Sequence, residues 1–350
     1  MKFHSNPIIS EDIHSIISAH LPWEDFSGKT ILISGANGFL PAYMVYTLLA
    51  LNDSRGSRCK VIALVRNKER GEKRFADYLG RPDFNLLVQD VSVPFRIEER
   101  LDYVIHAASQ ASPRYYGIDP VGTLRANVSG TLNLLENASA CGAVRFMFFS
   151  SSEVYGALPV EKMPAEETEY GSIDPTNVRA CYAESKRMGE TISVSWMHQF
   201  GLPAVIVRPF HTYGPGMALD DGRVYADFIS NIVNGQDITM NSDGSAVRAF
   251  CYIEDATLAF FSVLLKGQPG QAYNVGNDLG ECSIIGLAEK LVSLYPHKGL
   301  KINRFEPMGD HYIKSLVSRI VPDISKIKAL GWNPEFSIEK GFDRTINSYL

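Results

Sequence analysis

Residues 29–41 read KTILISGANGFLP, and the fold of the chain can be argued outward from this stretch. Its first six residues predict a buried strand, a glycine-containing turn follows at once, and residues 43–51 are typical of a helix. In this context Gly35 permits the tight turn, and Gly38 lets the backbone approach a pyrophosphate at the N-terminus of the helix. The turn therefore predicts a dinucleotide-binding site, with a glycine turn that holds no ligand as the alternative. The other turn residues expected to contact the dinucleotide are Asn37, Phe39 and Leu40.

The end of the next predicted strand, residues 60–65, bears on which dinucleotide binds. Arg66 follows this strand at the place where NAD-binding proteins usually carry an acidic residue for the ribose hydroxyls. A basic residue there can accept a 2′-phosphate, so we expect NAD and keep NADP open; a solvated loop is the alternative. Pro41 stands at the third small position of the turn, which is normally glycine, and proline is tolerated in a first helical turn.

Strands and helices continue to alternate beyond this point. Strands are predicted at residues 84–88, 101–105, 144–149 and 204–207, and a long helix at residues 120–141. This alternation predicts an α/β fold with a Rossmann-type, doubly wound parallel sheet, in which ligands bind at the carboxyl ends of the strands. The residues expected there beside the cofactor are Asp90 and Val91 near the adenine, Ala107, Ala108 and Ser109 near a ribose, and Asn127 in the helix.

A tyrosine and a lysine four residues apart, Tyr182 and Lys186, carry the predicted chemistry. On a helix this spacing places both side chains on one face, one turn apart. A nearby ammonium is expected to lower the pKa of Tyr182 from about 10 toward neutrality, so that the phenolate can take a proton from a sugar hydroxyl. A hydroxyl at Ser151 or Ser152, which follow a predicted strand, can orient that substrate oxygen. Taken alone, the pair is also compatible with an ordinary surface tyrosine and lysine.

The composition excludes several other classes of protein. The 350-residue chain is 45% hydrophobic and has a net charge of −5 with mixed signs, so it has no footprint for nucleic acid or an anionic membrane. No apolar run approaches the ~20 residues of a membrane span, and we expect no signal peptide. The five cysteines are scattered and lack a CxxC pair, so we expect neither a metal site nor disulfides. This pattern is typical of a protein in the reducing cytoplasm.

Several motifs occur in order between residue 29 and the C-terminus and together carry a resemblance. They are GANGFLP, HAAS, NVSGT, SSSEVYG, YAESK, RPFHTYGPG, DDGRV and RAFCYIED. The chain resembles the extended short-chain dehydrogenases/reductases of the nucleotide-sugar epimerase/dehydratase superfamily. Within that superfamily it most resembles the UDP-glucuronate decarboxylase (UDP-xylose synthase) family. The resemblance implies an NAD(P)-dependent enzyme with a nucleotide-sugar substrate.

The resemblance assigns roles to the residues that match its motifs. It implies that Tyr182 is the base, that Lys186 tunes it and binds the nicotinamide ribose, and that Ser151 or Ser152 is the hydroxyl partner. Glu153 matches a catalytic or substrate-contacting glutamate. The implied cofactor contacts also include Pro209, and the implied substrate contacts are Ser109, Arg114, Glu153, Tyr182, His211, Arg223, Arg248 and Arg319. Of these, Arg223 and Arg248 are expected to hold the nucleotide diphosphate.

The implied reaction begins with transient oxidation at C4 of the sugar. In UDP-glucuronate the resulting 4-ketone is β to the C6 carboxylate, so CO₂ can leave before the hydride returns to C4. A nucleotide-sugar 4-epimerase, a 4-ketoreductase or a 4,6-dehydratase of the dTDP-glucose type uses the same residues and stays open. Ser152 stands where the 4,6-dehydratases carry an aspartate, which disfavours elimination of water. A non-catalytic nucleotide-sensing protein is the alternative from a different class.

Two positions depart from the decarboxylase pattern near the expected substrate. His211 replaces an asparagine that contacts the substrate phosphates in the family. The decarboxylases also carry an arginine two residues before a Pro-Asp dipeptide, and here Ile320 occupies that place before Pro322. Arg319 lies one position further back and could reach the substrate carboxylate instead.

The chain is expected to form two parts. Residues 1–209, with about 249–268, make the NAD(P)-binding Rossmann domain. Residues 210–248 and 269–350 make a smaller C-terminal α/β lobe that binds the nucleotide sugar.

The resemblance also implies an assembly and a biological setting. Helices at residues 120–141 and 179–200 are expected to pair two copies into a cytoplasmic homodimer that supplies precursors for glycans and polysaccharides. A helix at residues 10–20, capped by Ser10, is expected to pack on the outside and to carry no chemistry.

Overall fold

The computed structural model describes residues 6–240, 242–304 and 318–350, which are organised around a seven-stranded sheet. The strand order is β10-β6-β5-β4-β1-β2-β3, and every neighbouring pair is parallel. The order reverses between β1 and β4, so the carboxyl ends of these strands open the crevice where doubly wound sheets bind ligands. The expected Rossmann-type α/β fold is confirmed. The strands are β1 (Thr30–Ser34), β2 (Lys60–Val65), β3 (Phe84–Val88), β4 (Tyr103–His106), β5 (Arg145–Phe149), β6 (Ala204–Pro209) and β10 (Ala272–Val275).

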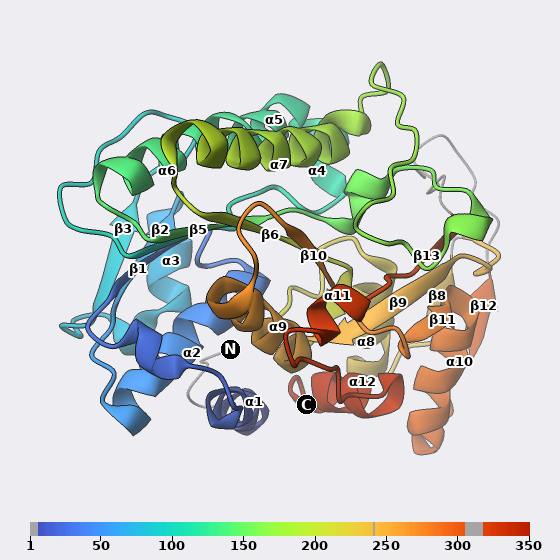
Figure 1. The fold of residues 1–350 in the computed structure, drawn as a ribbon. Helices are drawn as coiled ribbons and strands as arrows, with labels where there is room; N and C mark the ends of the chain where they lie inside the picture. The colour runs from blue at the N-terminus through green and yellow to red at the C-terminus, as the bar shows by residue number, and fades with distance from the viewer. Residues whose placement is uncertain (1–5, 241, 305–317) are drawn as a thin grey trace.

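Helices cover both faces of this sheet (Figure 1). In β1, Ile31 and Ile33 face a core shared with α1, α2 and α9, whereas Leu32 faces a second core shared with α6 and α7. Strands buried on both faces explain why their sequences are continuously apolar rather than alternating. The helices of these two layers are α1 (Pro7–Ser18), α2 (Phe39–Arg55), α3 (Lys68–Arg74), α5 (Pro120–Asn127), α6 (Ser129–Ala140), α7 (Ala180–Phe200) and α9 (Ile253–Lys266).

A smaller lobe lies beside the carboxyl ends of the large sheet. In it β9 pairs with β7, β11 and β13, and β8 pairs with β12. Its strands are β7 (His211–Tyr213), β8 (Ile238–Met240), β9 (Val247–Tyr252), β11 (Glu281–Ser283), β12 (Ile302–Arg304) and β13 (Arg319–Ile320). Its helices are α8 (Val224–Val233), α10 (Ile284–Leu294), α11 (Ser325–Lys328) and α12 (Ile338–Asn347). The remaining short helices are η2 (Trp23–Phe26), η3 (Ala76–Tyr78), α4 (Arg114–Ile118), η4 (Ser152–Tyr155), η5 (Val160–Lys162) and η6 (Pro296–Lys298).

The division into two parts differs in detail from the expected one. The start of the 249–268 segment belongs to β9 and therefore to the small sheet, and only α9 packs on the large sheet. Conversely, β10 pairs with β6 and extends the large sheet, although residues 269–350 were expected in the small lobe. The chain therefore crosses between the two sheets more often than its sequence pattern indicates.

Two predicted helices also differ from the observed ones. The long helix expected at residues 120–141 is divided at Val128 into α5 and α6, where the Thr131 hydroxyl donates to the carbonyl of Asn127, a contact that bends helices. The N-terminal helix begins at Pro7, with Asn6 rather than Ser10 as its cap. As expected, it packs on the outside: Glu11, His14 and Ser15 are exposed, while Asp12 on its inner face is fully buried.

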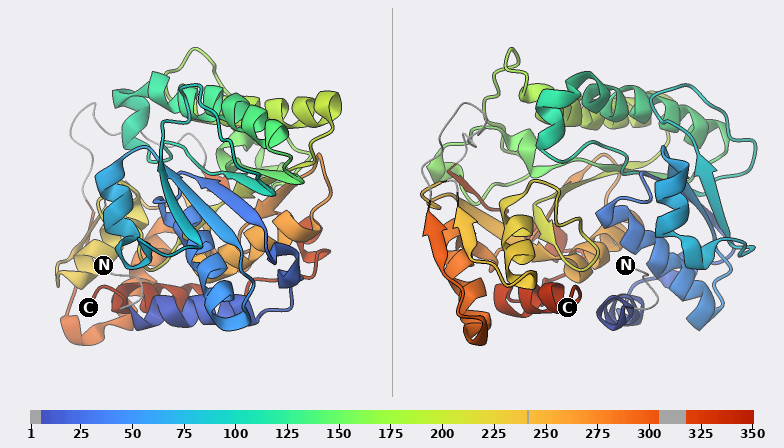
Figure 2. Two further views of the ribbon diagram at one scale, coloured as in Figure 1. Left: turned by 90° about the vertical axis from the view of Figure 1, so that its left-hand side faces the viewer. Right: turned by 180° about the vertical axis from the view of Figure 1, so that it is seen from behind.

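The N-terminal and C-terminal helices lie side by side at one end of the molecule (Figure 2). Arg344 of α12 donates to the buried carboxylate of Asp12 on α1, at 2.6 Å. The hydroxyl of Tyr252 at the end of β9 donates to the same carboxylate, at 2.9 Å. Within the described part of the chain, no helix has both the length and the apolar character that a membrane crossing requires.

Candidate active site

Helix α7 carries the predicted tyrosine and lysine at the carboxyl edge of the large sheet. Tyr182 and Lys186 are both buried and lie one helical turn apart. The Lys186 ammonium nitrogen lies 5.7 Å from the centre of the Tyr182 ring and donates to the carbonyl of Phe149, at 2.6 Å. Because Phe149 ends β5, this bond joins the helix to the strand that delivers the serines.

Residues 151–153, just beyond the end of β5, present two hydroxyls and a carboxylate. Ser151 is hydrogen bonded to Tyr182, and its hydroxyl oxygen accepts the backbone N–H of Glu153 at 3.2 Å, which caps η4. Ser152 is also buried, whereas Glu153 is exposed at the same edge. Sequence reasoning left open which serine meets the tyrosine, and this interaction favours Ser151.

The expected lowering of the tyrosine pKa is not found. Burial raises the pKa of Tyr182, while the hydrogen bond from Ser151 and the positive charge of Arg223 oppose that rise. Burial also lowers the pKa of Lys186 to about 7, and Glu190 opposes that fall. Desolvation therefore outweighs the charge–charge interaction that the spacing of the pair suggested, since it acts against the charged form of both groups.

Sequence reasoning missed Tyr116, which lies against the predicted base. Its ring stacks on that of Tyr182, with centroids 5.0 Å apart and planes inclined by 17°. The Tyr116 hydroxyl donates to the carbonyl of Ala111 at 3.1 Å, which Arg223 also approaches, at 3.4 Å. No local pattern marks Tyr116, because the contact joins α4 to α7 across more than sixty residues of sequence.

The turn after β1 is shaped to receive a dinucleotide. Gly35 has φ +65°, and a Cβ atom there would lie only 2.6 Å from the Cα of Ala108 after β4. The hydroxyl oxygen of Ser34 accepts the N–H groups of Ala107 and Ala108, both at 3.2 Å. These bonds hold the loops after β1 and β4 against each other at the crevice.

Helix α2 begins at this turn with an open N-terminus. Gly38 is its N-cap and provides no side-chain hydrogen bond, so the first N–H groups, those of Phe39 and Leu40, have no partner within the helix. Pro41 has no N–H of its own, which leaves one donor fewer for an anion. Asn37 completes the turn between the two glycines.

The other predicted cofactor residues lie around the same crevice. Asp90 follows β3 and accepts both the N–H and the hydroxyl of Ser92. Val91 is buried beneath α6, where a Cβ on Gly130 would lie 2.9 Å from it. Arg66 is exposed after β2, and Pro209 ends β6.

Two buried oxygens near α7 have no hydrogen-bond partner among the described residues. They are the side-chain amide oxygen of Asn127 and the hydroxyl of Ser109. The amide nitrogen of Asn127 donates to Ser185 on α7, at 2.9 Å. Both oxygens therefore remain available to a water molecule or a ligand.

The small lobe contributes a cationic group opposite the tyrosine. The group consists of Arg248 on β9 and Arg223 before α8, which lie near His211 on β7. Burial of His211 and the charges of the two guanidiniums lower its pKa to about 3. Its Nδ1 is buried without a partner in the described part of the chain. A neutral imidazole between two arginines suits a phosphate-bearing ligand. Arg114 lies nearby on α4 and donates to the carbonyl of Asp220 at 3.1 Å.

The structure does not bring Arg319 to the site. Arg319 and Ile320 are neighbours in β13, so their side chains point to opposite faces of the small sheet. Arg319 forms two hydrogen bonds with Glu281, at 2.7 and 2.9 Å. Ile320 packs with Tyr155 and Phe210 instead, beneath η4. Alternation along the strand is thus the reason that the neighbouring arginine cannot replace the missing one.

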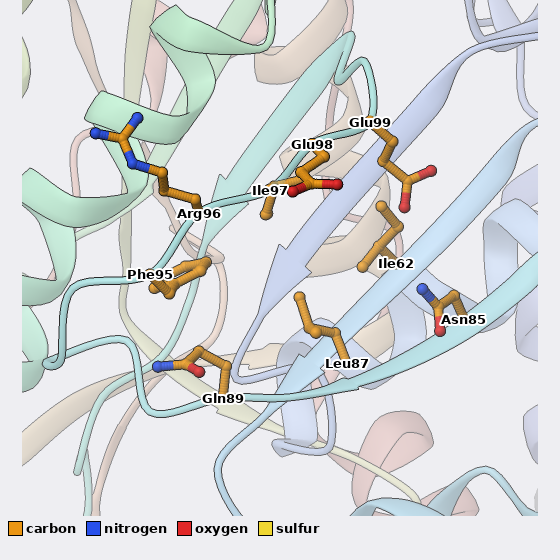
Figure 3. Close-up of a pocket in the computed structure, with 9 residues that line it drawn as sticks. All are labelled: Ile62, Asn85, Leu87, Gln89, Phe95, Arg96, Ile97, Glu98 and Glu99. Carbon is orange, nitrogen blue, oxygen red and sulfur yellow. The ribbon is translucent and has the colours of Figure 1, made fainter.

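A separate cavity of about 350 Å³ lies on the sheet away from these residues (Figure 3). Phe95, Ile62 and Leu87 form its apolar floor, and charged side chains stand at its rim. None of the predicted site residues lines it. Among the described residues, no group of three or more His, Cys, Asp or Glu side chains is arranged to hold a metal ion.

Comparisons with known proteins agree with this geometry. Residues 31–276 match the model of the NAD dependent epimerase/dehydratase family. UDP-glucuronic acid decarboxylase 5 from Arabidopsis thaliana is 35% identical over 317 residues, which cover 90% of this chain and 87% of that protein. Other relatives, from Xenopus tropicalis among them, also bear the name UDP-glucuronic acid decarboxylase.

Solved structures support the fold. A UDP-glucuronic acid 4-epimerase from Bacillus cereus, in complex with UDP-glucuronic acid and NAD, has a TM-score of 0.73 at 21% identity and covers 91% of this chain and 98% of its own. At that identity the similarity supports the fold alone. The family match extends over most of the chain and includes the glycine turn and the Tyr182/Lys186 helix. The chain therefore belongs to the NAD dependent epimerase/dehydratase family.

Proposed function

We propose that this protein is an NAD-dependent enzyme that transiently oxidises C4 of a nucleotide sugar, with decarboxylation of UDP-glucuronate as the first reaction to test. One observation carries the proposal. A buried phenol, Tyr182, is hydrogen bonded to Ser151 and lies one helical turn from Lys186, at the crevice formed by β1 and β4. The names of the relatives, UDP-glucuronic acid decarboxylases, support the choice of substrate.

The crevice fits the cofactor because Gly35 has no side chain. A Cβ atom there would lie 2.6 Å from the Cα of Ala108, so only glycine lets the loops after β1 and β4 meet at the crevice. In this proposal the pyrophosphate lies at the N-terminus of α2, the adenine near Asp90 and Val91, and the riboses near Ala107 and Lys186. When bound, NAD accepts the hydride of C4 and later returns it. Arg66 remains beside the adenosine ribose and keeps use of NADP open. The other residues proposed to contact the cofactor are Asn37, Gly38, Phe39, Leu40, Ala108, Ser109, Asn127 and Pro209.

Side chains of the protein orient the substrate oxygen and accept its proton. Ser151 holds the C4 hydroxyl in line with Tyr182, which takes its proton as the C–H bond breaks. Arg223 and Ser151 favour the phenolate, and the burial of Tyr182 keeps water from competing for its proton. A 4-ketone β to a carboxylate then serves as the electron sink for loss of CO₂. Glu153 lies at the same edge, in η4, and is proposed to contact the sugar.

A second candidate is favoured by the position of Arg319. No guanidinium on β13 faces the site, because Arg319 pairs with Glu281 and Ile320 packs under η4. A sugar with an uncharged C6 would not need a cation there. The same residues would then support 4-epimerisation or 4-keto reduction, whereas Ser152 in place of an acid disfavours 4,6-dehydration.

The assembly of the protein is argued from the surface of two helices. Exposed apolar side chains on α5 and α7 suit the pairing of two copies through these helices. They are Val121, Leu124, Met188 and Val194. We propose a homodimer that works in the cytoplasm on glycan precursors, in which the small lobe contributes the nucleotide-sugar contacts.

The test is incubation of the purified protein with NAD and UDP-glucuronate, or with UDP-glucose or UDP-galactose. Release of CO₂ with a UDP-pentose supports decarboxylation, whereas conversion of a neutral sugar at C4 supports the second candidate. Tyr182→Phe is the control and should abolish either reaction. If no nucleotide sugar is changed and none reduces the cofactor, the protein is not this enzyme, and a nucleotide-sensing role becomes the better reading.

A further inference from the structure

Glu190 lies on the same face of α7 as the two proposed catalytic residues, one turn beyond Lys186. Its carboxylate is largely shielded, with 13% of the side chain exposed. The Ser150 hydroxyl donates to one of its oxygens. Ser150 stands between Phe149, whose carbonyl receives the Lys186 ammonium, and Ser151, which meets Tyr182. The Glu190 carboxylate therefore binds the segment from Phe149 to Ser151, which contacts both Lys186 and Tyr182.

Arg208 holds that carboxylate from the opposite side. The guanidinium is buried and donates to both oxygens of Glu190, at 2.9 and 2.7 Å. Its third nitrogen donates to the Tyr155 hydroxyl, at 3.0 Å. Because Tyr155 ends η4, the pair is tied to both ends of the segment from Ser150 to Tyr155.

We propose that Glu190 is a positioning residue of the active site, which holds Ser150 and places a negative charge one helical turn from Lys186. This inference rests on the proposed function, because it assigns Glu190 a part in the same reaction. Glu190 itself does not reach the substrate, since Arg208 and Ser150 occupy its oxygens. It acts through Lys186 and through the strand end.

The charged groups around Lys186 support this role. On α7 it faces Tyr182 and Glu190, and from β4 it faces His106, which is neutral because burial and the ammonium lower its pKa to about 3. Glu190 is thus the acidic group that favours the ammonium form of Lys186. Loss of the carboxylate would also leave the positive charge of Arg208 without its partner. Both effects disfavour the ammonium, so the pKa of Lys186 should fall when Glu190 is replaced by glutamine.

The experiment compares Glu190→Gln with Ser150→Ala. Titration of Lys186 is followed by NMR on cofactor-free protein with ¹⁵N-labelled lysine, and Lys186→Met identifies the signal. Glu190→Gln should lower the titration midpoint by about 0.5–1 pH unit and move the alkaline limb of kcat to lower pH by the same amount. Ser150→Ala keeps the charge, so it should reduce kcat by about 3- to 10-fold at every pH and leave the midpoint unchanged.

Glu190→Asp keeps the charge on a shorter side chain and replaces Glu190→Gln if the latter does not fold. It should keep the midpoint of Lys186 but lower kcat with little change in KM. Equal midpoints in Glu190→Gln and the parent, or full activity of Ser150→Ala, would overturn the inference. A parent protein that turns over no nucleotide sugar would instead refute the proposed function, while the cofactor-free titration would still decide the role of Glu190.

Discussion

The ring of Tyr116 lies almost flat on the ring of Tyr182, with centroids 5.0 Å apart and planes inclined by 17°. Tyr116 belongs to α4, which is held by the bond from its hydroxyl to the carbonyl of Ala111. The stack covers one face of the proposed base, and burial is the main cause of the raised pKa of Tyr182. Tyr116 therefore sets the solvent exposure of the base.

Replacement of Tyr116 tests this relationship. Tyr116→Ala should admit water to the ring of Tyr182, lower its pKa toward the ordinary value and reduce kcat by about 10-fold, whereas Tyr116→Phe keeps the stack and most of the activity. The pKa is measured from tyrosinate absorbance as the difference from Tyr182→Phe. Tyr115→Ala, beside it on α4, is the matched control and should change neither quantity. An unaltered titration in Tyr116→Ala would mean that the stack does not shield the base.

A comparison of Gly35 with Gly56 separates the effect of a side chain at the dinucleotide-binding turn from the effect of backbone strain. Their φ values are +65° and +64°, so alanine should cost a similar amount of backbone strain at each, about 1 kcal/mol. Only at Gly35 does a Cβ meet the backbone of Ala108, at 2.6 Å; at Gly56 it meets nothing within 4 Å. Gly35→Ala should therefore abolish NAD binding in calorimetry, whereas Gly56→Ala should bind NAD like the parent. Equal affinity of the two variants would show that the cofactor does not lie against this turn.

Much of this architecture could be predicted because its signals are local. The Gly35 turn, the alternation of strands and helices, and the spacing of Tyr182 and Lys186 each lie within a few residues. The stack of Tyr116 and the pair of Glu190 and Arg208 could not be predicted, since each joins segments far apart in sequence.

Other expectations failed where tertiary packing overrides the local pattern. Strand alternation turns Arg319 away from the site, although its position in the sequence differs by only one residue from that of Ile320. Desolvation raises the pKa of Tyr182 where the spacing to Lys186 suggested a decrease. In both cases the behaviour of the side chain depends on the groups packed around it, and the local sequence does not specify those groups.

The buried ammonium of Lys186 makes stability depend on pH. Burial lowers its pKa from the ordinary 10.5 to about 7, so below pH 7 the group is charged in the folded and the unfolded protein and its burial costs stability. Between about pH 7 and 10.5 the unfolded chain binds more protons, so this cost declines as pH rises. Lys186→Met should therefore raise the free energy of unfolding at pH 6 by about 1 kcal/mol or more, with a gain that shrinks by pH 9. Urea denaturation at the two pH values measures it.

Lys290→Met is the control for this experiment. Lys290 is paired with Glu339 on the surface, and the pair raises its pKa rather than lowering it. Its replacement should change stability by less than about 1 kcal/mol at both pH values. A gain in Lys186→Met that does not depend on pH would show that the lysine is not buried as an ammonium.

The two neighbours in β13 should respond differently to substitution. Arg319→Ala removes a surface pair with Glu281, so it should change stability by less than about 1 kcal/mol and leave turnover unchanged. Ile320→Arg places a guanidinium on the face that carries Arg248, beneath η4. It should lower stability by about 2–4 kcal/mol and raise kcat/KM for UDP-glucuronate relative to UDP-glucose by about 10-fold. A loss of turnover in Arg319→Ala would mean that this arginine turns to the substrate after all.

Asp12 provides the last prediction, because its carboxylate joins three parts of the molecule. It accepts hydrogen bonds from Arg344 of α12, from Tyr252 of β9 and, at 3.2 Å, from Tyr43 of α2. Burial raises its pKa and the bond from Arg344 opposes that rise, so the carboxylate is stable only with its partner. Asp12→Asn leaves the guanidinium without a buried counter-charge and should lower the free energy of unfolding by about 3–5 kcal/mol. Glu11→Gln is the matched control, since Glu11 pairs with the same arginine but is 63% exposed, and it should cost less than about 1 kcal/mol. Equal destabilisation by the two variants would show that the surface pair, and not the buried one, holds α1 to the rest of the protein.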